Sequence, residues 1–364
     1  MTKQRPVYSL VIDALRFPLA LMIVLLHNNP LGIQVALCDN NLDLYHQYPV
    51  YYSIQHLFTN NITRIAVPLF FFFSGFLFFL KYKESSSKAL SVYYGGKIKR
   101  VLKTIVAPYF IWNAIYILFN LLIQYFFAGY LQGGQLLYKD YVWSDWLHLI
   151  WFPAGGHLWY LRDLFIVSIC SLPLFFVLRN KILGLCTILL FGCLWAYGTS
   201  NIFGVMTIES FFFWSMGSYI CLHGIDLSSA RKKLPIIAAL YIVTLVVEML
   251  LWRYGMPSFI YIERLGICIG ALLTLAVTSK LLISHNLEIN KLLPKASFFI
   301  YLSHSIILLF ISRAYTKFTP LSEMSLILEY FIAPILVAAL LVWLYKIMSR
   351  YTPSLLKVLT GGRE

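Results

Sequence analysis

The sequence predicts an all-α, polytopic integral membrane protein with about ten transmembrane helices and both termini in the cytoplasm. Apolar residues make up 60% of the chain and charged residues 12%, against roughly 45–50% and 25% in soluble proteins. Apolar runs of about 20 residues, the length that a helix needs to cross a bilayer, recur along the whole chain. Lysine and arginine gather in alternate connections between these runs, and this asymmetry sets the orientation.

The predicted helices follow one another with short or moderate connections. The first apolar run has full span length and no small-residue cleavage site, so we expect it to stay as a helix and not to be removed as a signal peptide. The later runs have the length that bilayer thickness requires. The predicted spans are 8–28, 62–80, 104–128, 157–178, 182–198, 206–222, 234–252, 260–283, 296–316 and 325–347.

The distribution of basic residues predicts the orientation. With the N-terminus placed inside, the inside connections hold most of the 29 lysines and arginines, and the outside loops and span ends hold Lys139, Arg253, Arg313 and Lys317. This bias supports cytoplasmic termini. It also accounts for the net charge of +14 without a nucleic-acid partner, and it makes a face that attracts anionic lipids or an anionic substrate. We expect one transmembrane domain over 1–350 and a short cytoplasmic tail over 351–364.

Arg16 and His27 lie inside the first span. An arginine at mid-helix costs roughly 2.5–3.5 kcal/mol by insertion scales, so it usually faces a protein interior or a polar path. Their separation corresponds to about 1100° of helical rotation and about 16 Å of rise, so the two side chains share one face at different depths. The alternative is a snorkelling arginine and an interfacial histidine. Asp13, three residues before Arg16, is either its neutralising partner or a member of the site.

Motifs of several soluble enzyme classes are missing from the chain. No serine lies in G-x-S-x-G, no histidine is followed by an aspartate four or five positions later, and no Walker A, H-E-x-x-H or Rossmann glycine pattern occurs. The chain has no CxxC, and Cys38 alone lies in a predicted outside loop, so we expect neither a disulfide nor a metal site. Any chemistry must use residues that several spans bring together.

Five segments in order resemble the acyltransferase-3 family of integral membrane acyltransferases. They are Arg16-x10-His27; Val67-Pro-Leu-Phe-Phe followed by Ser74-Gly75-Phe76; the basic loop Lys97-Ile-Lys-Arg100-Val-Leu-Lys103 leading to Pro108-Tyr109; His157-Leu-Trp159-Tyr160-Leu161; and Tyr301-Leu302-Ser303-His304. The family often shows Arg-x-x-Arg in the basic loop, where this chain offers either Lys97-x-x-Arg100 or Arg100-x-x-Lys103.

The resemblance implies a ten-helix bacterial inner-membrane enzyme that moves an acyl group, most often acetyl, from cytoplasmic acyl-CoA to a hydroxyl of a surface glycan or its lipid-linked precursor. Acyl-CoA is then the donor substrate, and no tightly bound cofactor is implied. The basic residues Arg100, Lys97 and Lys103 would hold the CoA phosphates. The pantetheine arm would pass Arg16 towards His27.

In this interpretation His27 takes the proton of the acceptor hydroxyl, because a neutral imidazole is the main form of histidine at neutral pH. An acyl-histidine intermediate is the alternative. The remaining candidates each have a structural alternative: Ser74 (thioester hydrogen bond or close helix packing), Trp159 (ligand platform or interfacial aromatic), and His304 and His157 (further catalytic groups or hydrogen-bonded packing). His46, His56, His148, His223 and His285 are expected in loops without a role.

A transporter of a polysaccharide or small metabolite is the competing function, with Arg16, Arg64, Arg162 and Glu248 as substrate or ion sites. The chain shows no paired halves with broken helices at matching positions, which are the usual sign of a transporter. A purely structural subunit leaves the shared face of Arg16 and His27 unexplained. The sequence names neither the acceptor nor the oligomeric state, and it does not separate acetyl from succinyl or longer donors.

Overall fold

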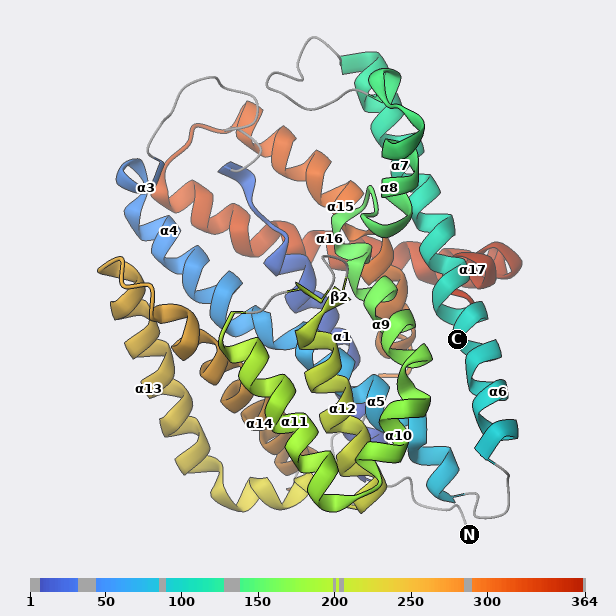
Figure 1. Ribbon diagram of the computed structural model, residues 1–364. Coiled ribbons are helices and arrows are strands. Elements are labelled where there is room, and N and C mark those ends of the chain that lie inside the picture. The colour runs from blue at the N-terminus through green and yellow to red at the C-terminus, as the bar shows by residue number, and fades with distance from the viewer. Residues whose placement is uncertain are drawn as a thin grey trace.

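The computed structural model is a bundle of helices (Figure 1), as the sequence predicts. It describes residues 7–31, 44–84, 90–127, 138–198, 201–202, 206–284 and 290–362, so Cys38 and His285 lie outside the described residues. Its strands are β1 (Asn201–Ile202) and β2 (Met206–Thr207), which pair antiparallel with Asn201 opposite Thr207. Within these described residues the fold is therefore all-α apart from one short ribbon.

The helices occur in the following order along the described chain. They are α1 (Val7–Leu26), α3 (Leu44–Gln47), α4 (Pro49–His56), η1 (Leu57–Ile62), η2 (Thr63–Ile65), α5 (Ala66–Glu84), α6 (Leu90–Val101), η3 (Leu102–Val106), α7 (Ala107–Phe127), η5 (Tyr138–Asp140), α8 (Trp143–Trp151), η6 (Gly156–Leu158), α9 (Trp159–Ile169), α10 (Ser171–Leu178), α11 (Lys181–Ala196), α12 (Ile208–His223), η7 (Leu227–Lys233), α13 (Leu234–Arg253), α14 (Phe259–Ser284), α15 (Leu293–Phe318), α16 (Glu323–Tyr351) and α17 (Pro353–Thr360).

Seven helical segments among the described residues are long and apolar enough to cross a membrane. Each predicted span coincides with a helix, but three of them do not meet this test as single straight helices. The predicted span 157–178 is a pair, α9 and α10, bent by 60°. Helices α11 and α12 each have 16 residues, which gives about 24 Å of length against a hydrocarbon core of about 30 Å.

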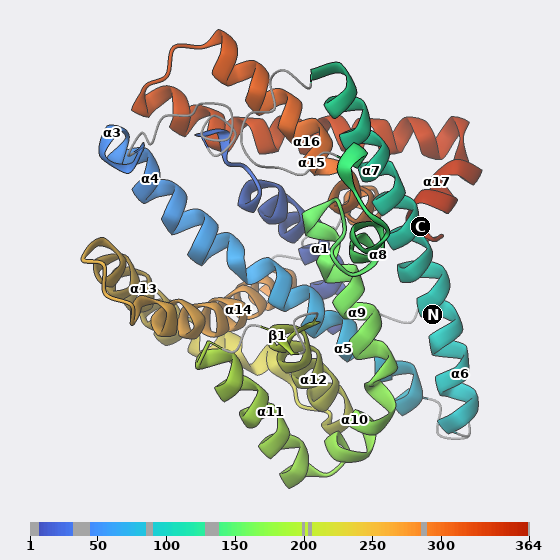
Figure 2. The same ribbon diagram turned by 45° about the horizontal axis from the view of Figure 1, so that its top comes forward.

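The second span begins earlier than the sequence analysis expects. The predicted outside loop before residue 62 contains α3 and α4, and the segment Pro49–Leu80 is one helical run of 32 residues. Figure 2 shows α4 leading into α5 as one rod through the bundle. The run is interrupted by η1, a π-helix, and by η2, a 3-10 helix. Such breaks in a helix often occur at functional sites.

Two glycines allow α5 and α12 to pack closely. A Cβ atom on Gly75 would collide with the Trp214 carbonyl, and one on Gly217 would collide with the Phe72 carbonyl. The Ser218 hydroxyl donates to the Gly75 carbonyl over 3.1 Å. Gly75 therefore has the packing role that the sequence analysis considered for the Ser74-Gly75 pair.

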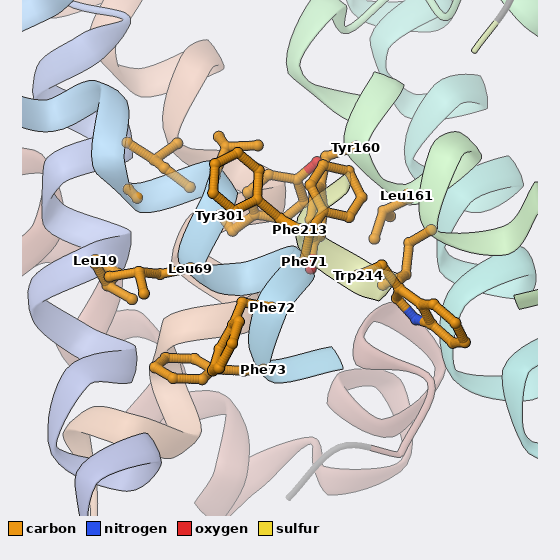
Figure 3. Packing of buried hydrophobic residues seen from close by; sticks show 14 of the residues in the cluster. Leu19, Leu69, Phe71, Phe72, Phe73, Tyr160, Leu161, Phe213, Trp214 and Tyr301 are labelled. Atoms are coloured by element: carbon orange, nitrogen blue, oxygen red, sulfur yellow. The ribbon is translucent and has the colours of Figure 1, made fainter. Parts of the chain in front are cut away.

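The central core joins these two helices to α1, α9 and α15. Figure 3 shows Phe71 of α5 among Tyr160, Phe213 and Tyr301, which come from three other helices. The ring centroids of Phe71 and Tyr160 are 4.6 Å apart, and those of Tyr160 and Tyr301 are 5.6 Å apart. This aromatic layer fixes the helices that carry the polar residues described below.

The C-terminal helix α17 packs against α7 on one side of the bundle (Figure 1). Leu356 and Thr360 are buried, and the Trp112 indole donates to the Leu359 carbonyl over 3.0 Å. The predicted tail 351–364 is thus a packed helix over most of its length.

Candidate active site

Three histidines from separate parts of the chain meet in the bundle. His27 follows the last turn of α1, His157 lies in η6 and His304 lies in α15. The ring centroid of His27 is 5.1 Å from that of His304 and 6.0 Å from that of His157, and the two latter rings are 4.7 Å apart. The structure therefore brings the proposed base together with both additional histidine candidates.

His27 is the accessible member of this cluster. Its side chain is exposed, whereas His157 and His304 retain only 4% and 0% of their accessible surface. Its Nδ1 lies 2.8 Å from the Ile23 carbonyl oxygen. A carbonyl can only accept a hydrogen bond, so Nδ1 carries the proton in the neutral ring and Nε2 keeps a free lone pair. That nitrogen can accept a proton.

His157 is held by hydrogen bonds at both ring nitrogens. Its Nε2 lies 3.3 Å from the Leu302 carbonyl oxygen, and its Nδ1 lies 2.9 Å from the Ser305 hydroxyl oxygen. The Tyr301 hydroxyl donates to the His157 carbonyl over 2.5 Å. With Nε2–H donating to Leu302, Nδ1 accepts the Ser305 proton, so no ring nitrogen of His157 is free.

The hydrogen bonds of His304 lie within its own helix. Its Nδ1 is 2.9 Å from the Tyr301 carbonyl oxygen, and its Nε2 is 3.4 Å from the Ser305 hydroxyl oxygen. The sequence analysis gave hydrogen-bonded packing as the alternative for this residue, and the hydrogen bonds that the structure shows lie inside α15. The Ser305 hydroxyl has one proton, and its contact with His157 is the shorter of the two, so it donates to His157. The Nε2 atom of His304 therefore keeps a free lone pair beside His27.

Arg16 and Asp13 form an ion pair on α1. The distance from Arg16 Nη1 to Asp13 Oδ1 is 3.3 Å, and the side chains are 43% and 26% exposed. This ion pair is the neutralising contact that the sequence analysis gave as one of two alternatives for Asp13. The partial exposure of both side chains leaves the guanidinium able to contact another group.

The residue after His27 is anchored by a buried network that the sequence analysis missed. Asn28 donates from Nδ2 to Glu329 Oε2 over 3.0 Å and to the Tyr330 carbonyl over 3.2 Å. The Ser312 hydroxyl lies 2.7 Å from Glu329 Oε1. The sequence did contain one sign of this network. Glu329 is an acidic residue inside the apolar run 325–347, and such residues usually have a polar partner.

Ser74 and Trp159 lie beside the aromatic layer. The Ser74 hydroxyl is 3.4 Å from the Tyr160 hydroxyl, and Trp159 is half-buried with its ring centroid 6.1 Å from that of Phe71. Neither residue contacts His27 through a hydrogen bond among the described residues. Their roles towards a thioester stay predictions.

The three basic candidates differ in their surroundings. Lys97 on α6 donates to the Leu77 carbonyl over 3.1 Å and lies 5.4 Å from the ring centroids of Phe78 and Tyr93. Arg100 and Lys103 are exposed, and their side chains form no hydrogen bond or ion pair with a described residue. Of the three candidates, Arg100 and Lys103 therefore have free side chains among the described residues, and Lys97 is tied to α5.

His56 has a structural role that the sequence analysis did not assign. It ends α4, and its Nε2 lies 2.7 Å from Oε1 of Glu248, which is fully buried on α13. His46, His148 and His223 also lie in helices, so placing these residues in loops was wrong. The pairing of His56 had no sequence signal, because its partner is 192 positions away.

Three comparisons with known proteins bear on this site. The family described as an acyltransferase domain matches residues 10–346. The succinoglycan biosynthesis protein ExoH of Rhizobium meliloti (strain 1021) is 26% identical over 317 residues, which cover 83% of this chain and 80% of the relative. No solved structure matches the chain. The first match covers all three histidines and Arg16.

Proposed function

This chain belongs to the acyltransferase-3 family, and from that premise we propose that it moves an acyl group, acetyl in the first instance, from cytoplasmic acyl-CoA to a hydroxyl of an extracytoplasmic carbohydrate or lipid-linked glycan. The proposal places the enzyme in the bacterial inner membrane as a multi-pass protein. Support for a glycan acceptor comes from the relative named for succinoglycan biosynthesis.

The accessible Nε2 of His27 carries this proposal. The Ile23 carbonyl holds the proton on Nδ1, so Nε2 can take the proton of an acceptor hydroxyl. The oxygen then attacks the thioester carbonyl, a C–O bond forms, and the C–S bond breaks. The departing CoA thiolate receives the proton from His27, which returns the ring to its starting state. His157 and His304 lie beside His27, and neither of them places a negative charge next to the base.

The donor route follows the basic residues and α1. CoA carries several phosphates, which suit the exposed Arg100 and Lys103. The pantetheine arm then extends along α1 past Arg16, which lies about 16 Å from His27 by helical rise. Arg16, held by Asp13 but half-exposed, is the cation along that path. The thioester would thus reach His27 from the cytoplasmic side.

A turnover assay with the purified full-length protein tests this function. In detergent with radiolabelled acetyl-CoA, we expect release of the CoA thiol or exchange of label with CoA, and strong loss of both in the His27→Ala variant. Succinyl-CoA in a parallel reaction identifies the preferred acyl group. Neither turnover nor exchange with any acyl-CoA would contradict the proposal and favour a transporter.

A further inference from the structure

Arg64 interacts electrostatically with two acidic residues and with His27. Arg64 lies on η2, which packs against α1 and α14. Glu209 lies in the first turn of α12, and Glu263 lies near the start of α14. Arg64 is within electrostatic reach of both carboxylates and of His27. Arg64 therefore links these two carboxylates to the proposed base.

Arg64 and Glu263 do not pair with each other. Both side chains are half-buried, and neither forms a hydrogen bond or an ion pair with any residue in the described part of the chain. Unpaired charges inside an apolar bundle are costly. Two opposite charges that are close but not in contact leave their donors and acceptors available to a polar molecule between them.

Arg264 also interacts electrostatically with Glu209 and Glu263, and its side chain is already held by backbone carbonyls. Arg264 donates from Nη1 to the carbonyls of Trp195 and Ala196, the latter over 3.0 Å. Glu209 is buried in the first turn of α12 and interacts electrostatically with Arg64 and Arg264. The Arg264 side chain is therefore occupied by backbone carbonyls, whereas Arg64 and Glu263 form no hydrogen bond or ion pair with a described residue.

A buried hydrogen-bond network fixes the position of Arg64. Glu248 accepts from His56 over 2.7 Å and from Asn61 over 2.8 Å, which ties both ends of the π-helix η1 to α13. The His56 ring is stacked on Trp252 with centroids 3.9 Å apart. Because η2 follows η1 directly, this network fixes the rotation of η2 and therefore the direction in which the Arg64 side chain extends from it.

The charge balance of the cluster indicates the chemical class of the ligand. Glu248, the third nearby carboxylate, is already paired with His56 and Asn61. The two side chains that remain available, Arg64 and Glu263, carry opposite charges, so an anion would meet the carboxylate and a cation would meet the guanidinium group. A neutral sugar ring suits both kinds of group, because each hydroxyl can accept from an arginine and donate to a carboxylate. A sugar bound here would present a further hydroxyl towards His27.

We propose that Arg64 and Glu263 bind the acceptor sugar, with Arg64 donating to its oxygens, Glu263 accepting from its hydroxyls, and Glu248 and His56 acting as positioning residues. This assignment rests on the proposed acyl transfer. In this assignment the donor and the acceptor reach His27 from different sides. The donor approaches along α1 from Arg16, and the acceptor is held by residues of η2 and α14.

Neutral glycosides provide the test, using purified full-length protein and radiolabelled acetyl-CoA. Methyl glucoside, galactoside and mannoside are offered as acceptors, with methyl glucuronide as the charged counterpart. We expect the neutral glycosides to be preferred. With the best of them, Arg64→Gln and Glu263→Gln should each raise the acceptor KM about 10-fold or more, because a hydrogen bond to a charged group is lost, while the KM for acetyl-CoA changes less than twofold.

Controls separate binding from folding. Arg253→Gln removes an exposed arginine at the end of α13 and should leave both KM values unchanged. Arg64→Lys keeps the charge and should raise the acceptor KM less than Arg64→Gln does. Thermal unfolding midpoints of all variants should stay close to that of the wild type.

Four results would overturn the assignment while leaving acyl transfer intact. These are an unchanged acceptor KM in both glutamine variants, a rise in the KM for acetyl-CoA instead, a preference for the glucuronide, and a wild type that turns over acetyl-CoA but acylates no neutral glycoside. Absence of acetyl-CoA turnover in the wild type would instead contradict the proposed function itself.

Discussion

The side-chain amide of Asn28 donates to the carboxylate of Glu329 over 3.0 Å, and both side chains are buried. Asn28 directly follows His27, and Glu329 lies on α16. Ser312 of α15 adds a contact to each of them, at 3.1 Å from Asn28 Oδ1 and 2.7 Å from Glu329 Oε1. This network joins the end of α1 to the helix that carries His304, so it maintains the spacing of the two histidines.

Removal of the Asn28 amide should harm both folding and activity. In Asn28→Ala, the buried Glu329 carboxylate keeps the Ser312 hydroxyl but loses the donor to its Oε2 atom, and an unsatisfied buried polar group typically costs about 1–3 kcal/mol. We expect a lower unfolding midpoint, together with a kcat reduced more than the KM for acyl-CoA is raised, because His27 loses its anchor. A variant that unfolds at the wild-type midpoint with unchanged kcat would show that the network does not position His27.

His27→Ala should abolish acyl transfer while expression and folding stay near normal. The side chain is exposed and, among the residues that the structure describes, makes one hydrogen bond, to the Ile23 carbonyl, so its loss removes little packing. Loss of a general base typically costs about 10²- to 10⁴-fold in rate. The measurement is acyl transfer at matched protein concentration. Activity within a few-fold of the wild type would move the base to His157 or His304.

The sequence predicted the fold class and the position of most helices, since apolar runs of span length are a direct consequence of bilayer thickness. It misplaced the start of the second span. The segment from Pro49 contains polar residues such as Gln55 and Asn61, which look like a loop but are buried against other helices. Tertiary packing thus overrides the local pattern there.

The site was predictable only in part. Arg16 and His27 share one helix, so helical periodicity alone relates them. His157 and His304 entered through the family resemblance, because no local pattern reveals that residues so far apart meet. The contacts of Asn28 with Glu329 and of His56 with Glu248 join distant segments, and an isolated polar residue in an apolar run does not identify its partner.

Arg100→Ala should weaken acyl-CoA binding and reduce its dependence on salt. The guanidinium is exposed and unpaired among the described residues, so its interaction with a phosphate is partly screened by solvent and ions. Equilibrium binding of acetyl-CoA at low and high salt measures the effect. Lys97→Ala serves as a comparison, because Lys97 is tied to the Leu77 carbonyl. Unchanged CoA affinity in Arg100→Ala would remove this residue from the donor site.

Arg16→Lys should impair transfer although it preserves the charge. A lysine ammonium cannot reproduce the planar fork of the guanidinium, which is held by Asp13 and half-exposed to the proposed donor path. We expect a reduced kcat/KM for acyl-CoA with normal expression. Full activity in this variant would show that Arg16 supplies only charge.

The side of the membrane on which the acyl donor must be supplied tests the predicted topology and the mechanism together. If both termini are cytoplasmic and His27 lies near the outer end of the first span, the acyl group crosses most of the bilayer on its pantetheine arm. In sealed right-side-out vesicles, an acceptor added outside should be modified only when acyl-CoA is supplied in the lumen, which corresponds to the cytoplasm. Donor added outside should be nearly inert, because the basic inside loops that attract CoA face away from it. Equal product from donor on either side of intact vesicles would mean that the predicted orientation or the route across the bilayer is wrong.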